Sequence, residues 1–115
     1  MYNLRSISSD RIRLNVGGKI FETELDTLKN VRFGLLFDVA REENWKQRRD
    51  IFFDRDPTYF RYILNFLREK KIRIRNLLFY RKEDLHHSIS LFLDETIAQE
   101  SRSALIKEFK YFGLY

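Results

Sequence analysis

Polar and apolar side chains alternate along residues 11–16, RIRLNV, as they do in a strand that buries one face. The dipeptide Gly17-Gly18 follows and supplies the positive φ angles of a tight hairpin turn. Strand-forming residues return over residues 19–25. We therefore predict a β-hairpin over residues 11–25.

Residues 51–68, IFFDRDPTYFRYILNFLR, combine a strand, a turn and a helix in one run. Three apolar residues of strand-forming type come first, and charged residues then end the strand. Asp56 is a good N-cap residue, and Pro57, the only proline, suits the first helical position. The apolar residues that follow have the i, i+3, i+4, i+7 spacing of one helix face: Phe60, Ile63, Leu64 and Leu67. We predict a buried helix with a capped start.

Shorter sequence signals predict three further helices. A short helix begins near Asp26 or Thr27, both of which are possible N-caps. A second apolar face over residues 33–40 predicts another helix. A final helix occupies residues 104–115, where Gly113 is placed as a C-terminal glycine.

The remaining segments have weaker patterns. Residues 1–10 are expected to form a flexible tail, and residues 41–50 a charged loop. A short strand is possible at residues 72–74. Residues 83–93 have mixed periodicity, and the polar residues 94–103 predict a loop or an exposed helix.

Composition indicates one globular domain. The chain has 115 residues, of which 43% are hydrophobic and 34% charged, enough for a single core. The 11 Phe and 6 Tyr could exceed what that core can hide, so we expect an interface between protomers. The sequence contains no cysteine, no apolar run of membrane-spanning length and no signal-peptide pattern, so we expect a cytoplasmic protein.

Basic residues are concentrated in residues 68–82 of a chain with a net charge of +5. Such a cluster can bind nucleic acid or an acidic partner, but it is more often a solvated face, which makes nucleic acid the weaker prediction. In this segment only Glu69 opposes the basic residues Arg68, Lys70, Lys71, Arg73, Arg75, Arg81 and Lys82.

Catalytic and metal-binding patterns are missing from the sequence. We find no nucleophile elbow and no His-Glu-x-x-His pair. His86 and His87 are adjacent and point to different faces, so they form a poor metal site. Capping and ion pairing explain Asp54 and Asp56 more simply than acid–base chemistry does. We predict a protein that is not an enzyme and has no cofactor and no metal.

Three stretches in order resemble the BTB/POZ-like tetramerisation domain of voltage-gated potassium channels and of the KCTD proteins. They are LNVGGKIFETELDTL at 14–28, IFFDRDPTYFRYILNFLR at 51–68 and LIKEFKYFGL at 105–114. The resemblance covers roughly residues 11–75 and 104–115. It implies an α+β fold in which a sheet of three or more strands is flanked by helices, with residues 11–115 as one domain.

The resemblance also implies an assembly module whose subunits form a ring, a tetramer in the channels and often a pentamer in KCTD proteins. The family's ring interface is largely polar, and paired charges across such an interface fix its register. A cap within one subunit remains an equal alternative for the acidic residues of the central turn. By position, the expected interface residues are Arg13, Asn15, Thr23, Asp54, Arg55 and Asp56.

Some positions depart from the family pattern. Arg32 and Gly34 stand where the family usually has Pro and Ser or Thr, and Phe109 stands where it usually has Ala. A residue as large as Phe109 implies local repacking. The segment 76–103 is atypically long. The zinc that some channel subfamilies hold between subunits needs Cys ligands, which this sequence lacks.

Many KCTD-type domains bind a cullin scaffold through the second helix and nearby loops. The corresponding surface here would include Phe33, Leu36, Phe37 and Trp45. A cullin-type ubiquitin-ligase adaptor is therefore an alternative function. An exposed tryptophan could anchor such an interface, although its ring could instead fold back on the core.

Overall fold

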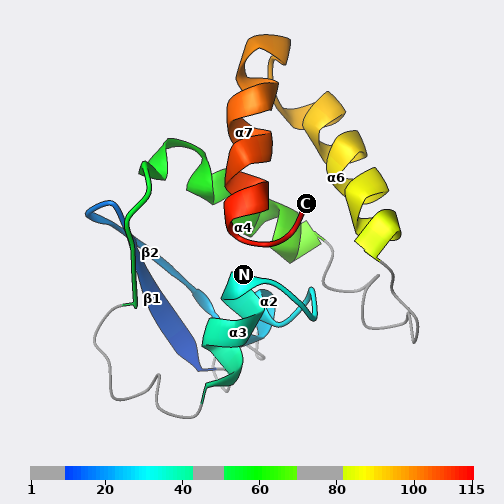
Figure 1. Ribbon diagram of the computed structural model, residues 1–115. Helices are drawn as coiled ribbons and strands as arrows, with labels where there is room; N and C mark the ends of the chain where they lie inside the picture. The colour runs from blue at the N-terminus through cyan, green and yellow to red at the C-terminus, as the bar shows by residue number, and fades with distance from the viewer. Residues whose placement is uncertain (1–9, 43–50, 70–81) are drawn as a thin grey trace, which may run out of the picture.

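The computed structural model describes residues 10–42, 51–69 and 82–115, which form a small sheet and a set of helices (Figure 1). This arrangement confirms the predicted α+β fold. In chain order the elements are β1 (Arg11–Val16), β2 (Lys19–Glu24), α2 (Leu25–Leu28), α3 (Leu35–Arg41), β3 (Ile51–Phe53), the 3-10 helix η2 (Pro57–Tyr59), α4 (Phe60–Glu69), α6 (Lys82–Thr96) and α7 (Gln99–Tyr111).

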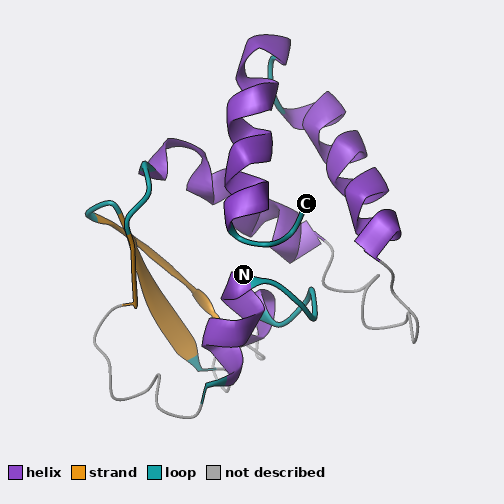
Figure 2. Cartoon of the chain, viewed as in Figure 1, coloured by secondary structure: helices purple, strands orange, loops and turns teal. Residues whose placement is uncertain are grey.

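The sheet has three strands in the order β2-β1-β3, with β1 antiparallel to β2 and parallel to β3. Leu14 at its centre is opposite Phe21 on β2 and Ile51 on β3. The helices gather on one side of the sheet (Figure 2), so the alternating residues of β1 separate into a buried face and an uncovered face. The predicted hairpin and the strand at residues 51–53 are both confirmed.

The hairpin turn lies against the turn that follows β3. Gly17 and Gly18 both have positive φ angles, 58° and 101°. The Gly17 N–H donates to the Phe53 carbonyl at 2.9 Å, and the Gly18 N–H donates to Asn15 Oδ1 at 2.8 Å. A Cβ added to Gly17 would lie 2.2 Å from the Arg55 carbonyl oxygen. The two turns are therefore packed backbone to backbone.

The capped start predicted at Asp56 is confirmed. Its side chain accepts a hydrogen bond from the Thr58 N–H at 2.9 Å and another from the Thr58 hydroxyl, which begins η2. These hydrogen bonds lower the pKa of the Asp56 carboxyl below its usual range. Helix α4 follows directly and buries the predicted apolar face.

Two predicted helix starts are wrong. Helix α2 begins at Leu25, so Asp26 and Thr27 lie inside it and neither is its N-cap. The Leu25 N–H donates to the Asp10 carbonyl at 2.8 Å, which continues the β1–β2 ladder by one pair, and the helix begins there without a side-chain cap. Helix α7 begins at Gln99, five residues before the predicted start at Ala104.

Helix α6 explains the mixed pattern of residues 83–93. Its buried side chains are Leu85, Ile89, Phe92 and Leu93, which have a helical i, i+4, i+7, i+8 spacing. Leu91 is 49% exposed, and its place beside two buried apolar residues hides that spacing in the sequence. Of the two alternatives predicted for residues 94–103, a loop or an exposed helix, the helix holds for most of the segment, because α6 ends at Thr96 and α7 begins three residues later.

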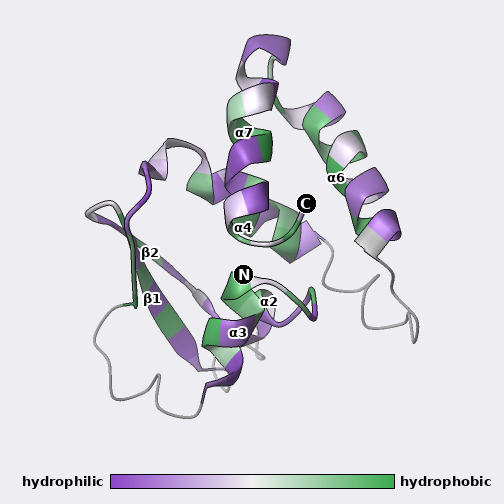
Figure 3. Ribbon diagram, in the orientation of Figure 1, coloured by the Kyte–Doolittle hydropathy of each residue, from purple (hydrophilic) through white to green (hydrophobic). Residues whose placement is uncertain are grey.

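The end of α7 confirms the predicted C-terminal glycine. Gly113 has a φ of 75°, its N–H donates to the Lys110 carbonyl, and the Leu114 N–H donates to the Phe109 carbonyl at 2.9 Å. Phe109 itself is fully buried and packs edge-to-face on Phe66 of α4, with ring centroids 5.4 Å apart. Aromatic packing between α4 and α7 therefore accommodates the large residue in the apolar interior, where the helices face one another (Figure 3).

Several predictions fall outside the described residues: Trp45, the short strand at residues 72–74 and the basic residues at 70–81. In the parts of the chain that are described, no helix is long and apolar enough to cross a membrane.

The contact between the two turns predicts different costs for two neighbouring glycine substitutions. Gly17→Ala should lower the free energy of unfolding by about 2 kcal/mol or more, because its Cβ would clash with the Arg55 carbonyl in addition to the positive φ. Gly18→Ala is the matched control and should cost only about 1 kcal/mol, since no atom lies within 4 Å of its added Cβ. Urea denaturation measures both, and equal losses would contradict the packed turns.

The cap at Asp56 predicts a pH-dependent difference between the wild type and Asp56→Asn. The folded pKa is lowered, so the carboxylate stabilises the fold above the unfolded pKa of about 3.9, and this stabilisation is lost as the pH falls through the folded value. The melting temperature of the variant should lie below that of the wild type at neutral pH, and the two should converge in acid. Thermal unfolding at one protein concentration measures this, and a gap that is constant with pH would contradict it.

Candidate assembly surface

The uncovered face of the sheet carries exposed apolar side chains. Ile20 on β2 and Phe52 on β3 both lie opposite Asn15 of β1, so the three residues form one row across the sheet. Phe52 is 59% exposed and Ile20 37%. Exposed apolar side chains gathered on a face that no helix of the described residues covers are typical of a surface that another protein covers.

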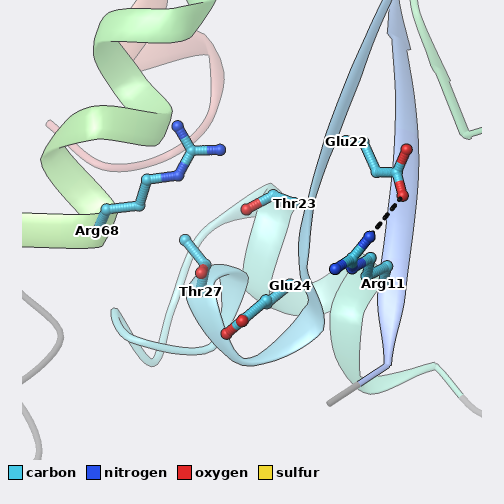
Figure 4. Close-up of a pocket in the computed structure, with 6 residues that line it drawn as sticks. All are labelled: Arg11, Glu22, Thr23, Glu24, Thr27 and Arg68. Carbon is cyan, nitrogen blue, oxygen red and sulfur yellow. Dashed lines mark ion pairs between the residues drawn. The ribbon is translucent and has the colours of Figure 1, made fainter. Parts of the chain in front are cut away.

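A polar hollow of about 550 Å³ opens where β2 leads into α2. Thr23 and Thr27 are 6% and 4% exposed, and their side chains line the hollow. Figure 4 shows Arg68 extending from α4 toward the Thr23 hydroxyl. We call this site the threonine hollow, and its lining residues are Arg11, Glu22, Thr23, Glu24, Thr27 and Arg68.

The groups of the threonine hollow suit a carboxylate. Arg11 and Glu22 face each other at its rim, 3.9 Å apart. Arg68 donates to Asn65 Oδ1 at 3.3 Å, but among the described residues no carboxylate pairs with its guanidinium. Thr23 and Thr27 bring two hydroxyl groups to the lining of the hollow. Two hydroxyl donors and an Arg fork can together bind an acidic side chain.

The second candidate surface is the acidic turn, residues 54–56 after β3. Asp54 and Asp56 are exposed. Arg55 lies between them in sequence but is held by α7, because its Nη2 donates to Glu108 Oε1 at 2.7 Å and its Nε donates to Oε2 at 3.3 Å. These hydrogen bonds raise the pKa of the Arg55 guanidinium. The turn therefore exposes two carboxylates to solvent, while the Arg55 guanidinium is bound to α7.

The threonine hollow and the acidic turn lie at opposite ends of β1. Arg11 begins the strand and lines the hollow. Val16 ends it and pairs with Phe53, which directly precedes the acidic turn. Six residues of strand separate the two surfaces by roughly 17 Å. One subunit therefore cannot place its own acidic turn in its own hollow.

The predicted interface residues occupy different settings. Arg13 is exposed on the uncovered face, whereas Asn15 is half-buried and accepts from the Gly18 N–H within the chain. Thr23 lines the hollow. The predicted alternative of a cap within one subunit describes Asp56, and Arg55 is likewise engaged within the chain.

Sequence reasoning missed three residues of these surfaces: Thr27, Arg68 and Glu108. Thr27 was interpreted as a cap and Arg68 as one member of the basic cluster. The resembling family usually has Glu at the position of Glu108, directly before the position of Phe109, and this match was the available signal for its role. Within the described ranges no group of three or more potential metal ligands occurs.

The predicted partner-docking residues are only partly accessible. Leu36 is 1% exposed and belongs to the core. Phe33 and Phe37 are half-buried, and Phe37 lies under the Arg41 guanidinium at 5.5 Å. Trp45 lies outside the described residues.

Comparison with known proteins identifies relatives along most of the chain. A BTB/POZ domain-containing protein of Arabidopsis thaliana is 46% identical over 70 residues, which are 59% of this chain and 16% of that protein. The BTB/POZ domain-containing protein KCTD21 of Homo sapiens is 44% identical over 63 residues, 52% of this chain and 24% of that protein. A potassium channel regulatory protein of Mus musculus is 34% identical over 112 residues, 85% of this chain and 40% of that protein.

The chain thus spans less than half the length of each of these relatives. The sequence pattern of the BTB/POZ domain matches residues 12–115, nearly the whole chain. The three-stranded mixed sheet with its helices agrees with the resemblance found in the sequence. The chain belongs to the BTB/POZ domain family, of the potassium-channel tetramerisation type.

Proposed function

We propose that this chain is a non-enzymatic assembly module that joins identical subunits into a closed ring, a tetramer or a pentamer. The acidic turn of one subunit enters the threonine hollow of the next. The BTB/POZ family and the KCTD relatives support an interaction and oligomerisation module at the coarser level. The observation that carries the finer proposal is the chemical match between the hollow and the turn.

The proposed contact pairs opposite charges at Arg68, while the Glu22 and Glu24 carboxylates of the same hollow balance its charge. Asp54 and Asp56 offer carboxylates, while the hollow offers the Arg68 guanidinium and the hydroxyls of Thr23 and Thr27. Hydrogen bonds between charged groups are the stronger kind, and they also fix register between partners. Asp54 is the better ligand of the two acids, because Asp56 already caps η2.

The separation of the two surfaces, roughly 17 Å along β1, allows identical subunits to join head to tail. When different patches of identical subunits meet head to tail, the assembly closes into a ring if the rotation between subunits permits it. The uncovered row of Ile20, Asn15 and Phe52 lies on the same sheet and could add apolar area to the contact.

The other predicted functions have weaker support. A cullin-adaptor role would need an accessible surface around α3, where Leu36 is buried. Nucleic-acid binding would depend on residues 68–82, most of which lie outside the described ranges. Both stay predictions, as does the cytoplasmic location.

Charge reversal at either surface should break the assembly. We expect the wild type to have four or five times the 14.1 kDa chain mass by light scattering. Asp54→Arg and Arg68→Glu should each weaken self-association by on the order of a hundredfold, because like charges would meet at the contact. Glu83→Arg is the matched control on α6, and its mass should equal that of the wild type.

The thermal unfolding of the concentrated variants provides the folding control for this comparison. A wild type that stays at the mass of one chain at every concentration would contradict the proposal. Rings that persist in both charge-reversed variants would show that the subunits meet through other surfaces.

A further inference from the structure

Arg55 is surrounded by competing carboxylates. Its sequence neighbours are Asp54 and Asp56, yet both of its hydrogen bonds from the guanidinium go to Glu108, 53 residues later. The guanidinium carbon also lies 4.5 Å from the centroid of the Tyr111 ring. Glu108 and Tyr111 are one turn apart on α7, so they hold the guanidinium from the same helix face.

Burial of the Glu108 side chain favours its ion pair with Arg55. The Glu108 side chain is 12% exposed and that of Arg55 is 33% exposed. A largely buried carboxylate requires a cation, and the ion pair that Glu108 makes is with Arg55. Asp54 and Asp56 are exposed and solvated, so they do not depend on Arg55 in the same way.

We propose that Glu108 is a positioning residue for self-association. By holding Arg55 on α7, it keeps the guanidinium away from Asp54 and Asp56 and leaves their carboxylates available to the threonine hollow of the next subunit. This inference rests on the proposed ring assembly. It assigns control of the contact to a residue of the last helix that does not itself lie at the contact.

The backbone of the acidic turn has anchors that do not involve Glu108. The N–H groups of Gly17 and Arg55 both donate to the Phe53 carbonyl at 2.9 Å. Asp56 and Thr58 close the other end of the turn. Removing the charge of Glu108 should therefore release the Arg55 side chain and leave the path of the backbone in place.

Glu108→Gln tests the inference because it removes the charge while keeping the size of the side chain. The released Arg55 should neutralise the neighbouring acids and raise the dissociation constant of the assembly roughly tenfold, as measured by light scattering over a concentration series. Glu95→Gln is the matched control. It makes the same chemical change at an exposed position of α6 and should leave the dissociation constant unchanged.

The double variant Arg55→Gln, Glu108→Gln separates positioning from a merely structural role. With no cation left beside Asp54 and Asp56, its dissociation constant should return to within about threefold of the wild type. If the ion pair mattered only for stability, the double variant would assemble no better than Glu108→Gln. That result would overturn the inference.

The failures of the two proposals are distinguishable. A wild type that forms rings together with a Glu108→Gln variant that forms them equally well would overturn the inference alone. A monomeric wild type would overturn both. If Glu108→Gln does not fold, as thermal unfolding would show, the double variant decides by itself, because the inference requires it to assemble like the wild type.

Discussion

The paired hydrogen bonds between Arg55 and Glu108 join the turn after the edge strand β3 to the last helix, and they decide which charges of that turn stay exposed. They connect two motifs that are 53 residues apart. On the other side of the same turn, the Gly17 turn packs directly on the Arg55 backbone. The hairpin, the acidic turn and α7 therefore meet at one point, and each fixes the others.

This junction divides the charges of the turn into two groups. The cation is turned inward, where it neutralises a buried carboxylate and stacks on Tyr111. The carboxylates of Asp54 and Asp56 are exposed to solvent, and Asp56 is held in place because it caps η2. A complementary polar hollow lies at the other end of β1. Surfaces that match but lie apart on one subunit can make head-to-tail contacts, in which charge complementarity sets register as much as affinity.

Local sequence patterns predicted the parts of the fold that depend on neighbouring residues. The alternation of residues 11–16, the glycine pair, the Asp56 cap and the helix face after it were all confirmed. The predicted start of α2 was wrong because the helix begins at Leu25, directly where the β1–β2 ladder ends, and has no side-chain cap. The sequence did not predict helix α6, because exposed Leu91 interrupts the spacing of its buried apolar residues.

The candidate site was less predictable than the fold. Position in the family pattern indicated Thr23 and Asp54, but it could not give the direction of the Arg55 side chain, which is set by a residue on a distant helix. Thr27 and Arg68 come from different elements, so only the packing of α2 against α4 shows that they share a hollow.

The head-to-tail contact is tested most directly by mixing two variants that are each defective at a different surface. Asp54→Arg retains an intact hollow and Arg68→Glu retains an intact turn, so each should be monomeric alone. An equimolar mixture should assemble beyond the mass of one chain, because the unaltered turn of Arg68→Glu meets the unaltered hollow of Asp54→Arg, and the other contact pairs opposite charges in the reversed order. A mixture that stays monomeric by light scattering, while both variants remain folded, would contradict the pairing of the acidic turn with the threonine hollow.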